Sequence, residues 1–205
     1  NGNHEMHDRG RGYFTRLLPW CHQNASYFGI YNRYWRLLGI DTAYKDHDIF
    51  PIQNGWLKYH LTAGPQANIL LSHHQLFSAY DDRPRKSNLP ATVRELGLCD
   101  HVFAWFWGHE HACVIYEEAP EWEHIRDRCV GHGGKAVTIE HFSSATEPAP
   151  PVVARFTVPR TSEGGPIRNG FVLLELEGPR MRVRYIDETG DDTGMPREEW
   201  ISPVS

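Results

Sequence analysis

The 205-residue sequence predicts an α/β fold in which buried strands deliver histidines to one edge of a sheet. Two runs carry this prediction: QANILLSHH at residues 66–74 and VFAWFWGH at residues 102–109. Both are short and continuously apolar, which is typical of strands buried on both faces, and both end in histidine. Because open α/β sheets bind ligands beyond the carboxyl ends of their strands, we expect a functional site there.

Other strands are expected before and between these runs. Residues 25–32 and 34–41 are rich in aromatic and branched side chains, and a turn at Asn32 and Arg33 separates them, so they read as neighbouring strands. A helix is predicted over residues 89–97, between the two apolar runs.

A second helix is predicted over residues 51–62. Pro51 is tolerated in a first helical turn, and Ile52, Trp56 and Tyr59 fall on one face at helical spacing.

The C-terminal half reads as mostly β-structure. Residues 112–118 and 124–134 predict a strand pair, and residues 161–170, TSEGGPIRNG, predict a flexible loop. Residues 170–190 alternate apolar with polar side chains on either side of Gly178-Pro179, which predicts an antiparallel hairpin.

Composition excludes several classes of protein. The chain is 40% hydrophobic and 23% charged with a net charge of −5, as expected of one globular domain over residues 1–205. No apolar run is long enough to span a bilayer, so we expect no membrane segment. Acidic and basic residues are interspersed without a basic stripe, so we expect no stable nucleic-acid binding.

The cysteines point to a reducing compartment. They are far apart in the sequence, form no C-x-x-C pair and lie mostly in apolar surroundings, which favours free thiols and a cytoplasmic location. They are Cys21, Cys99, Cys113 and Cys129.

Three short motifs gather groups that bind metals. His109 and His111 flank Glu110 after a strand and a glycine, and residues two apart in an extended chain point the same way, so both imidazoles can face one site. Imidazole favours Zn, Fe or Mn over Mg or Ca. The other two motifs are the S-H-H at Ser72 and the opening G-N-H-E, in which Asn3 is a neutral oxygen ligand.

The order G-N-H-E, S-H-H and G-H-E-H resembles the calcineurin-like metallophosphoesterase superfamily, and the surrounding strings resemble its bacterial members. The resemblance implies a two-layer β-sandwich flanked by helices, four layers in the order α/β/β/α. It also implies two divalent transition metal ions (Mn, Fe or Zn) about 3.5 to 4 Å apart.

The resemblance also implies roles for individual residues. Asn3, His73 and His109 would hold one metal and His111 the other, while His4 would be the general acid that protonates the leaving oxygen. The next histidine, residue 74, does not match the ligand position, so we expect it behind the ligands or on the surface. His132, in a later glycine loop, either touches substrate or belongs to a simple turn.

One part of the family's pattern does not appear in the sequence. The D-x-H and G-D-x-x-[DE] blocks that supply most ligands of the first metal would precede Asn1. Neither Asp46-His47-Asp48 nor Asp100-His101 replaces them, because both lie in the wrong order. We therefore expect the chain to be the C-terminal portion of a phosphoesterase domain, completed by a preceding segment that carries the N-terminal strands.

The function expected from these motifs is metal-dependent hydrolysis of a phosphoester whose identity the sequence does not give. The alternative is a catalytically incomplete fragment of the same fold that acts as a metal-binding or interaction module. A structural site for a single metal is a third reading, since three or four ligands from distant loops can support one. Upstream D-x-H and G-D motifs would favour the enzyme.

Overall fold

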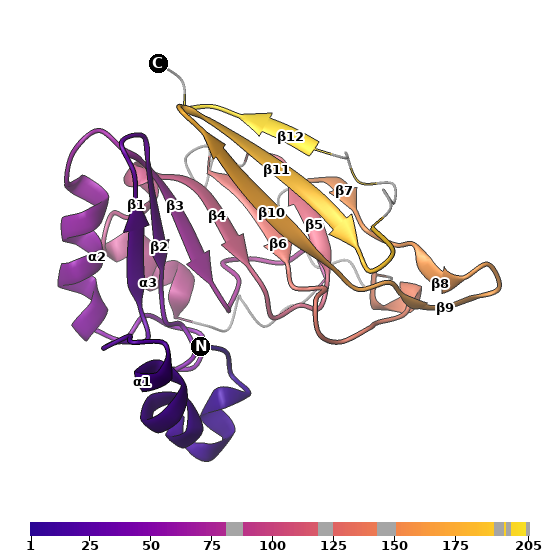
Figure 1. The fold of residues 1–205 in the computed structure, drawn as a ribbon, viewed down its shortest axis with the longest axis horizontal. Helices are drawn as coiled ribbons and strands as arrows, with labels where there is room; N and C mark the ends of the chain where they lie inside the picture. The colour runs from indigo at the N-terminus through magenta and orange to yellow at the C-terminus, as the bar shows by residue number, and fades with distance from the viewer. Residues whose placement is uncertain (81–87, 119–124, 143–150, 191–194, 196–197, 204–205) are drawn as a thin grey trace.

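The computed structural model describes residues 1–80, 88–118, 125–142, 151–190, 195 and 198–203 (Figure 1). Its central element is a seven-stranded mixed sheet in the order β1-β2-β3-β4-β6-β5-β7. The strands are β1 Phe28–Tyr31, β2 Trp35–Gly39, β3 Ala67–Ser72, β4 Val102–Trp107, β5 Cys113–Tyr116, β6 Arg126–Val130 and β7 Val152–Arg155.

Four neighbouring strands of this sheet, β2, β3, β4 and β6, run parallel. Ser72 pairs with Trp107, and Trp107 pairs with Cys129, so β3, β4 and β6 end level with one another. The outer strands β1, β5 and β7 pair antiparallel with their neighbours. The carboxyl ends of the parallel strands therefore share one edge, as the two apolar runs predicted.

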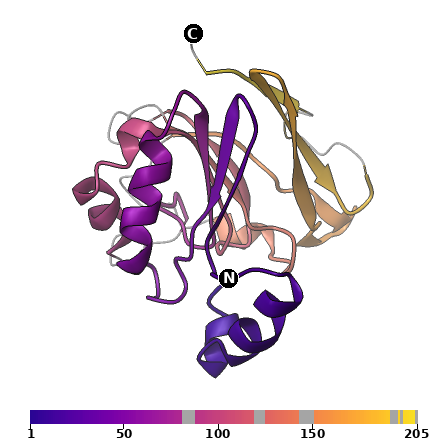
Figure 2. The same cartoon turned by 60° about the vertical axis from the view of Figure 1, so that its left-hand side comes forward.

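Helices cover one face of the large sheet and a second sheet covers the other (Figure 2). The helices are α2 Ile52–Thr62 and α3 Leu89–Glu95; the short α1 Leu18–Trp20 lies in the N-terminal segment. The second sheet consists of β10 Gly170–Glu177, β11 Arg180–Asp187 and β12 Glu198–Ile201. The mixed α/β class is confirmed, but only three of the four expected layers, α/β/β, are present in the described part of the chain, which places no helix outside the second sheet (Figure 2).

The predicted helix is confirmed as α2, and its buried stripe does not include Ile52 or Tyr59. Ile52 and Tyr59 are each 67% exposed, whereas Gln53, Leu57 and Leu61 form the buried stripe. Gln53 faces inward because its amide exchanges two hydrogen bonds with the backbone of Asp41, at 2.9 and 2.8 Å. A buried side-chain amide needs hydrogen-bond partners, and Gln53 finds both of its partners on the Asp41 backbone. These two bonds fix which face of the helix turns toward the sheet.

The expected loop over residues 161–170 is wrong. Residues Pro159–Thr161 (β8) and Gly164–Ile167 (β9) form a small antiparallel hairpin, in which Gly164 and Gly165 have φ of 101° and 99°. The glycines that suggested flexibility begin β9 directly after the turn, with positive φ values that favour glycine. The hairpin at Gly178-Pro179 and the pairing of β5 with β6 are confirmed.

Large apolar side chains fill the core between the layers. Trp105 and Trp107 are 0% and 1% exposed, so these tryptophans pack in the interior and do not form a stacking surface. All four cysteines are free thiols, as expected. Among the described residues, no helix combines the length and apolar character needed to cross a membrane.

Candidate metal centre

The N-terminal turn lies at the edge where the parallel strands end. The side-chain amide of Asn1 donates a hydrogen bond of 2.8 Å to Asp41, which lies two residues beyond the end of β2 and is 1% exposed. The same carboxylate accepts the backbone N–H groups of Ala43 and Tyr44. Asp41 thus ties the opening residues to the loop that leaves β2.

Three of the predicted ligands converge at this edge. Nε2 of His73 lies 2.8 Å from Oδ1 of Asn3 and 3.0 Å from Nδ1 of His109. Ligand atoms bound at about 2.1 Å to one ion lie about 3 Å apart when their bonds meet at right angles. The separations therefore fit a transition metal as well as they fit direct hydrogen bonds, and the donor set is one that Zn, Fe and Mn accept.

Gly2 brings the turn close to His73. A Cβ at this position would lie 3.0 Å from both Cε1 and Nδ1 of the imidazole and 3.1 Å from Oε2 of Glu5. The Glu5 carboxylate accepts the Gly2 N–H at 2.7 Å and closes the turn. A residue without a side chain is thus needed where the backbone passes the His73 ring.

The segment Gly108–His111 is not extended, contrary to expectation. His109 and His111 have φ of 63° and 53°, in the left-handed region. Glu110 turns inward instead: it is 2% exposed and accepts hydrogen bonds from Trp107 Nε1 at 2.9 Å and from the Ser78 hydroxyl. The buried carboxylate holds the chain in a tight turn because its partners lie in the core.

His111 lies next to a different part of the molecule. It lines a narrow cavity together with His132 and Lys135, where His132 is 5% exposed. His111 is still near enough to His73 to oppose its protonation. The assignment of His111 to a second metal remains a prediction, and so does substrate contact by His132.

Sequence reasoning missed a second group of imidazoles. His47, His74 and His109 each offer a donor atom within 4.8 Å of the others, and the group could hold a metal ion. His74 is fully buried, so its expected surface alternative is wrong. The only sequence signal for His47 was the D-H-D string at residues 46–48, which resembled no motif at the correct place.

Burial keeps the central imidazoles neutral. Loss of hydration is the largest cause that lowers the pKa of His73 from 6.5 to about 4 and that of His74 to about 2; neighbouring imidazoles add to both shifts, and the N-terminal amine adds to that of His73. Neutral imidazoles can bind metal at pH 7 without first losing a proton.

His4 occupies the same turn as Asn3 but faces solvent. Its ring is exposed and lies 4.8 Å from the ring of His7, centroid to centroid. The two adjacent side chains thus point to different places: Asn3 contacts His73, whereas His4 is exposed to solvent.

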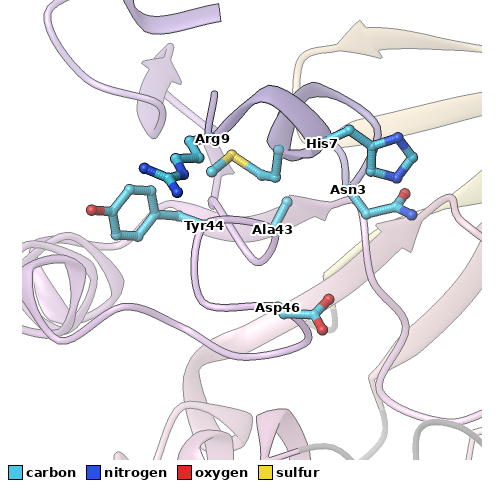
Figure 3. Close-up of a pocket in the computed structure, with 7 residues that line it drawn as sticks. Asn3, His7, Arg9, Ala43, Tyr44 and Asp46 are labelled. Atoms are coloured by element: carbon cyan, nitrogen blue, oxygen red, sulfur yellow. The ribbon is translucent and has the colours of Figure 1, made fainter. Parts of the chain in front are cut away.

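An open pocket of about 680 Å³ begins at Asn3. Asn3 and His7 line one side of it, Arg9 and Tyr44 lie together at the other, and Asp46 projects from the loop after β2 (Figure 3). The pocket offers room beside the converging ligands and includes a guanidinium.

No protein-family model and no curated protein sequence matches the chain. Solved structures do resemble it. Purple acid phosphatase PPD1 from yellow lupin (Lupinus luteus) seeds aligns with a TM-score of 0.59 at 14% identity, covering 86% of this chain and 32% of that chain. GAP50, the anchor in the inner membrane complex of Plasmodium, aligns with a TM-score of 0.57 at 10% identity, covering 87% of this chain and 54% of that chain.

The chain thus spans about a third and about half of the length of these two proteins. Both have the calcineurin-like metallophosphoesterase fold, and this chain shares part of that fold over most of its own length.

Proposed function

We propose that the chain contributes to metal-dependent hydrolysis of a phosphoester. The observation that carries the proposal is the convergence of Asn3 Oδ1, His73 Nε2 and His109 Nδ1 at the strand ends. These three would hold one divalent transition ion, with His111 contributing to a second. When bound, such ions clamp the phosphate and lower the pKa of a water molecule, making hydroxide available near neutral pH.

In this proposal the chain's own residues determine the net charge of the site and supply the proton for the leaving group. Asn3 is a neutral ligand and the imidazole of His73 is neutral, so the site keeps the positive charge that attracts a phosphate. His4 sits one residue from Asn3 on an exposed turn, a position suited to protonating the departing oxygen.

The pocket supports an anionic substrate. His7 lines it beside Asn3 and Arg9 lines the opposite side, where a guanidinium forms strong charge-assisted hydrogen bonds to anionic oxygens of a substrate. Tyr44 offers an aromatic face at the same end of the pocket as Arg9, where the leaving group of the ester would lie.

Fold alone does not choose between enzyme and non-enzyme, because function depends on sites and not on architecture. One protein of similar fold is a phosphatase and the other is described as an anchor. A metal-binding or interaction module is therefore the competing candidate. The converging ligands beside an open pocket that includes the Arg9 guanidinium favour the hydrolase.

The test uses this chain together with any natural sequence that flanks it, loaded with Mn²⁺ or Zn²⁺. We expect hydrolysis of p-nitrophenyl phosphate or bis(p-nitrophenyl) phosphate, and its loss in Asn3→Ala and His73→Ala. His101→Gln is the matched control, since His101 precedes β4 at the strand end opposite His109. Absence of hydrolysis in the loaded protein, or full activity of both variants, would refute the proposal.

A further inference from the structure

One ring nitrogen of His74 is hydrogen-bonded, and the other has no hydrogen-bond partner among the described residues. Its Nδ1 lies 2.9 Å from the carbonyl oxygen of Thr42 and therefore carries the proton that it donates. Its Nε2 then holds the lone pair, and within the described residues that atom is buried without a hydrogen-bond partner. The whole side chain is 0% exposed, so bulk water does not reach it.

His47 repeats this arrangement on a different loop. Its Nδ1 lies 2.9 Å from a carboxylate oxygen of Asp46, and its Nε2 is likewise buried with no partner among the residues described. Asp46 and His47 have φ of 41° and 62°, so a strained turn holds this ring in place. An oxygen acceptor behind each imidazole is the arrangement that orients histidine ligands toward metals.

The two rings meet each other and His109. The His47 and His74 centroids are 3.8 Å apart, and His109 lies 5.1 Å from the first and 4.7 Å from the second. Packing of neutral rings explains the contact but not the two bare lone pairs, which cost free energy when buried. A cation between them satisfies both.

We infer that His47, His74 and His109 form a transition-metal site. It shares His109 with the proposed catalytic set of Asn3, His73 and His109, and its other two ligands are different. Three neutral imidazoles favour Zn²⁺, or Co²⁺ as its spectroscopic substitute, over Mg²⁺ or Ca²⁺. A neutral imidazole has one lone pair, so His109 serves one ligand set at a time. An ion held by His47 and His74 thereby competes for a ligand of the proposed catalytic metal.

The inference does not depend on hydrolytic activity, and its test measures binding alone. The background is the 205-residue chain with Asn3→Ala and His73→Ala, which removes two ligands of the catalytic set. We expect this background to bind one Co²⁺ with visible d–d absorption and to lose that signal when Zn²⁺ is added. Binding of no Co²⁺ by the folded background would overturn the inference.

Variants of the exposed turn then identify the ligands. In the same background, His47→Gln should weaken Co²⁺ binding by about 100-fold or more, whereas Asp46→Asn, which replaces the carboxylate behind His47 with a neutral amide that still accepts a hydrogen bond, should weaken it by only about tenfold. His101→Gln should bind like the background. His47 is partly exposed, so its substitution keeps the fold, which circular dichroism checks. Unchanged affinity in His47→Gln would also overturn the inference.

Discussion

Oδ1 of Asn3 lies 2.8 Å from Nε2 of His73, across a sequence separation of 70 residues. The contact depends on two anchors: the Asn1 amide on Asp41, and the close passage of Gly2 along the imidazole. The geometry of these two proposed ligands is therefore set by how the first turn packs against the end of β3. We expect small changes in that packing to alter the affinity for a metal ion.

Gly2→Ala tests this dependence. The added Cβ would come within 3.0 Å of the His73 ring, so either the ring or the Asn3 turn must shift, and we expect metal affinity to fall by about tenfold or more, as when supporting residues are lost. Isothermal titration with Mn²⁺ or Zn²⁺ measures it. Gly12→Ala is the matched control, because a Cβ there meets nothing within 4 Å. Equal affinities would show that the turn can adjust.

His4→Asn tests the proposed proton donor in the metal-loaded protein with its natural flanking sequence. A positioned acid typically contributes 10² to 10⁴ in rate, so we expect kcat to fall by about 10²-fold or more while metal content stays constant. The loss should shrink for esters with good leaving groups, which need no proton. Loss of metal in this variant would instead make His4 a ligand.

The sequence predicted the strands that carry the site because each is decided locally. Continuous apolar runs such as residues 67–72 and 102–107 have few alternatives to a buried strand, and the parallel arrangement then brings their ends together. The placement of His73 and His109 at neighbouring strand ends was predicted in this way, whereas Asn3 and the ligand roles of all three residues came from the family resemblance and remain predictions. The parallel topology brings His73 and His109 together, whereas the contact of Asn3 with His73 depends on the packing of the N-terminal turn.

Tertiary contacts decided what the sequence did not predict. The rotation of α2 follows from the pairing of Gln53 with Asp41, a long-range contact that hydrophobic periodicity does not contain. The position of His47 follows from a left-handed turn that carries it to His74 at the end of another strand. Glu110 likewise turns inward because the groups that donate hydrogen bonds to its carboxylate, on Ser78 and Trp107, lie in the core.

Arg9→Gln tests the pocket. The guanidinium would bind substrate equally in the ground state and the transition state, because it is remote from the bond that breaks. We therefore expect KM for an anionic phosphoester to rise roughly fivefold, since an exposed ion pair contributes about 1 kcal/mol, with kcat unchanged. Steady-state kinetics separate the two constants. A fall in kcat at constant KM would place Arg9 in the chemical step instead.

His132 should make folding sensitive to acid. Burial lowers its pKa from 6.5 to about 4, so the folded protein keeps it neutral while the unfolded chain takes up a proton below pH 6.5. Stability rises with pH wherever the unfolded state binds more protons. The stabilisation from neutral His132 is thus fully present above pH 6.5 and is lost as the pH falls toward about 4.

Comparison with His132→Asn isolates this contribution, because His73 and His74 titrate in both proteins and cancel. Urea unfolding at pH 7.5 and pH 5 should show the difference in unfolding free energy between wild type and variant shrinking by about 2 kcal/mol at the lower pH, as the two pKa values require. The exposed His101→Asn should show no such change. If the difference in unfolding free energy between wild type and His132→Asn is the same at both pH values, His132 is not held neutral in the folded state. Its ring must then face water or an acidic group.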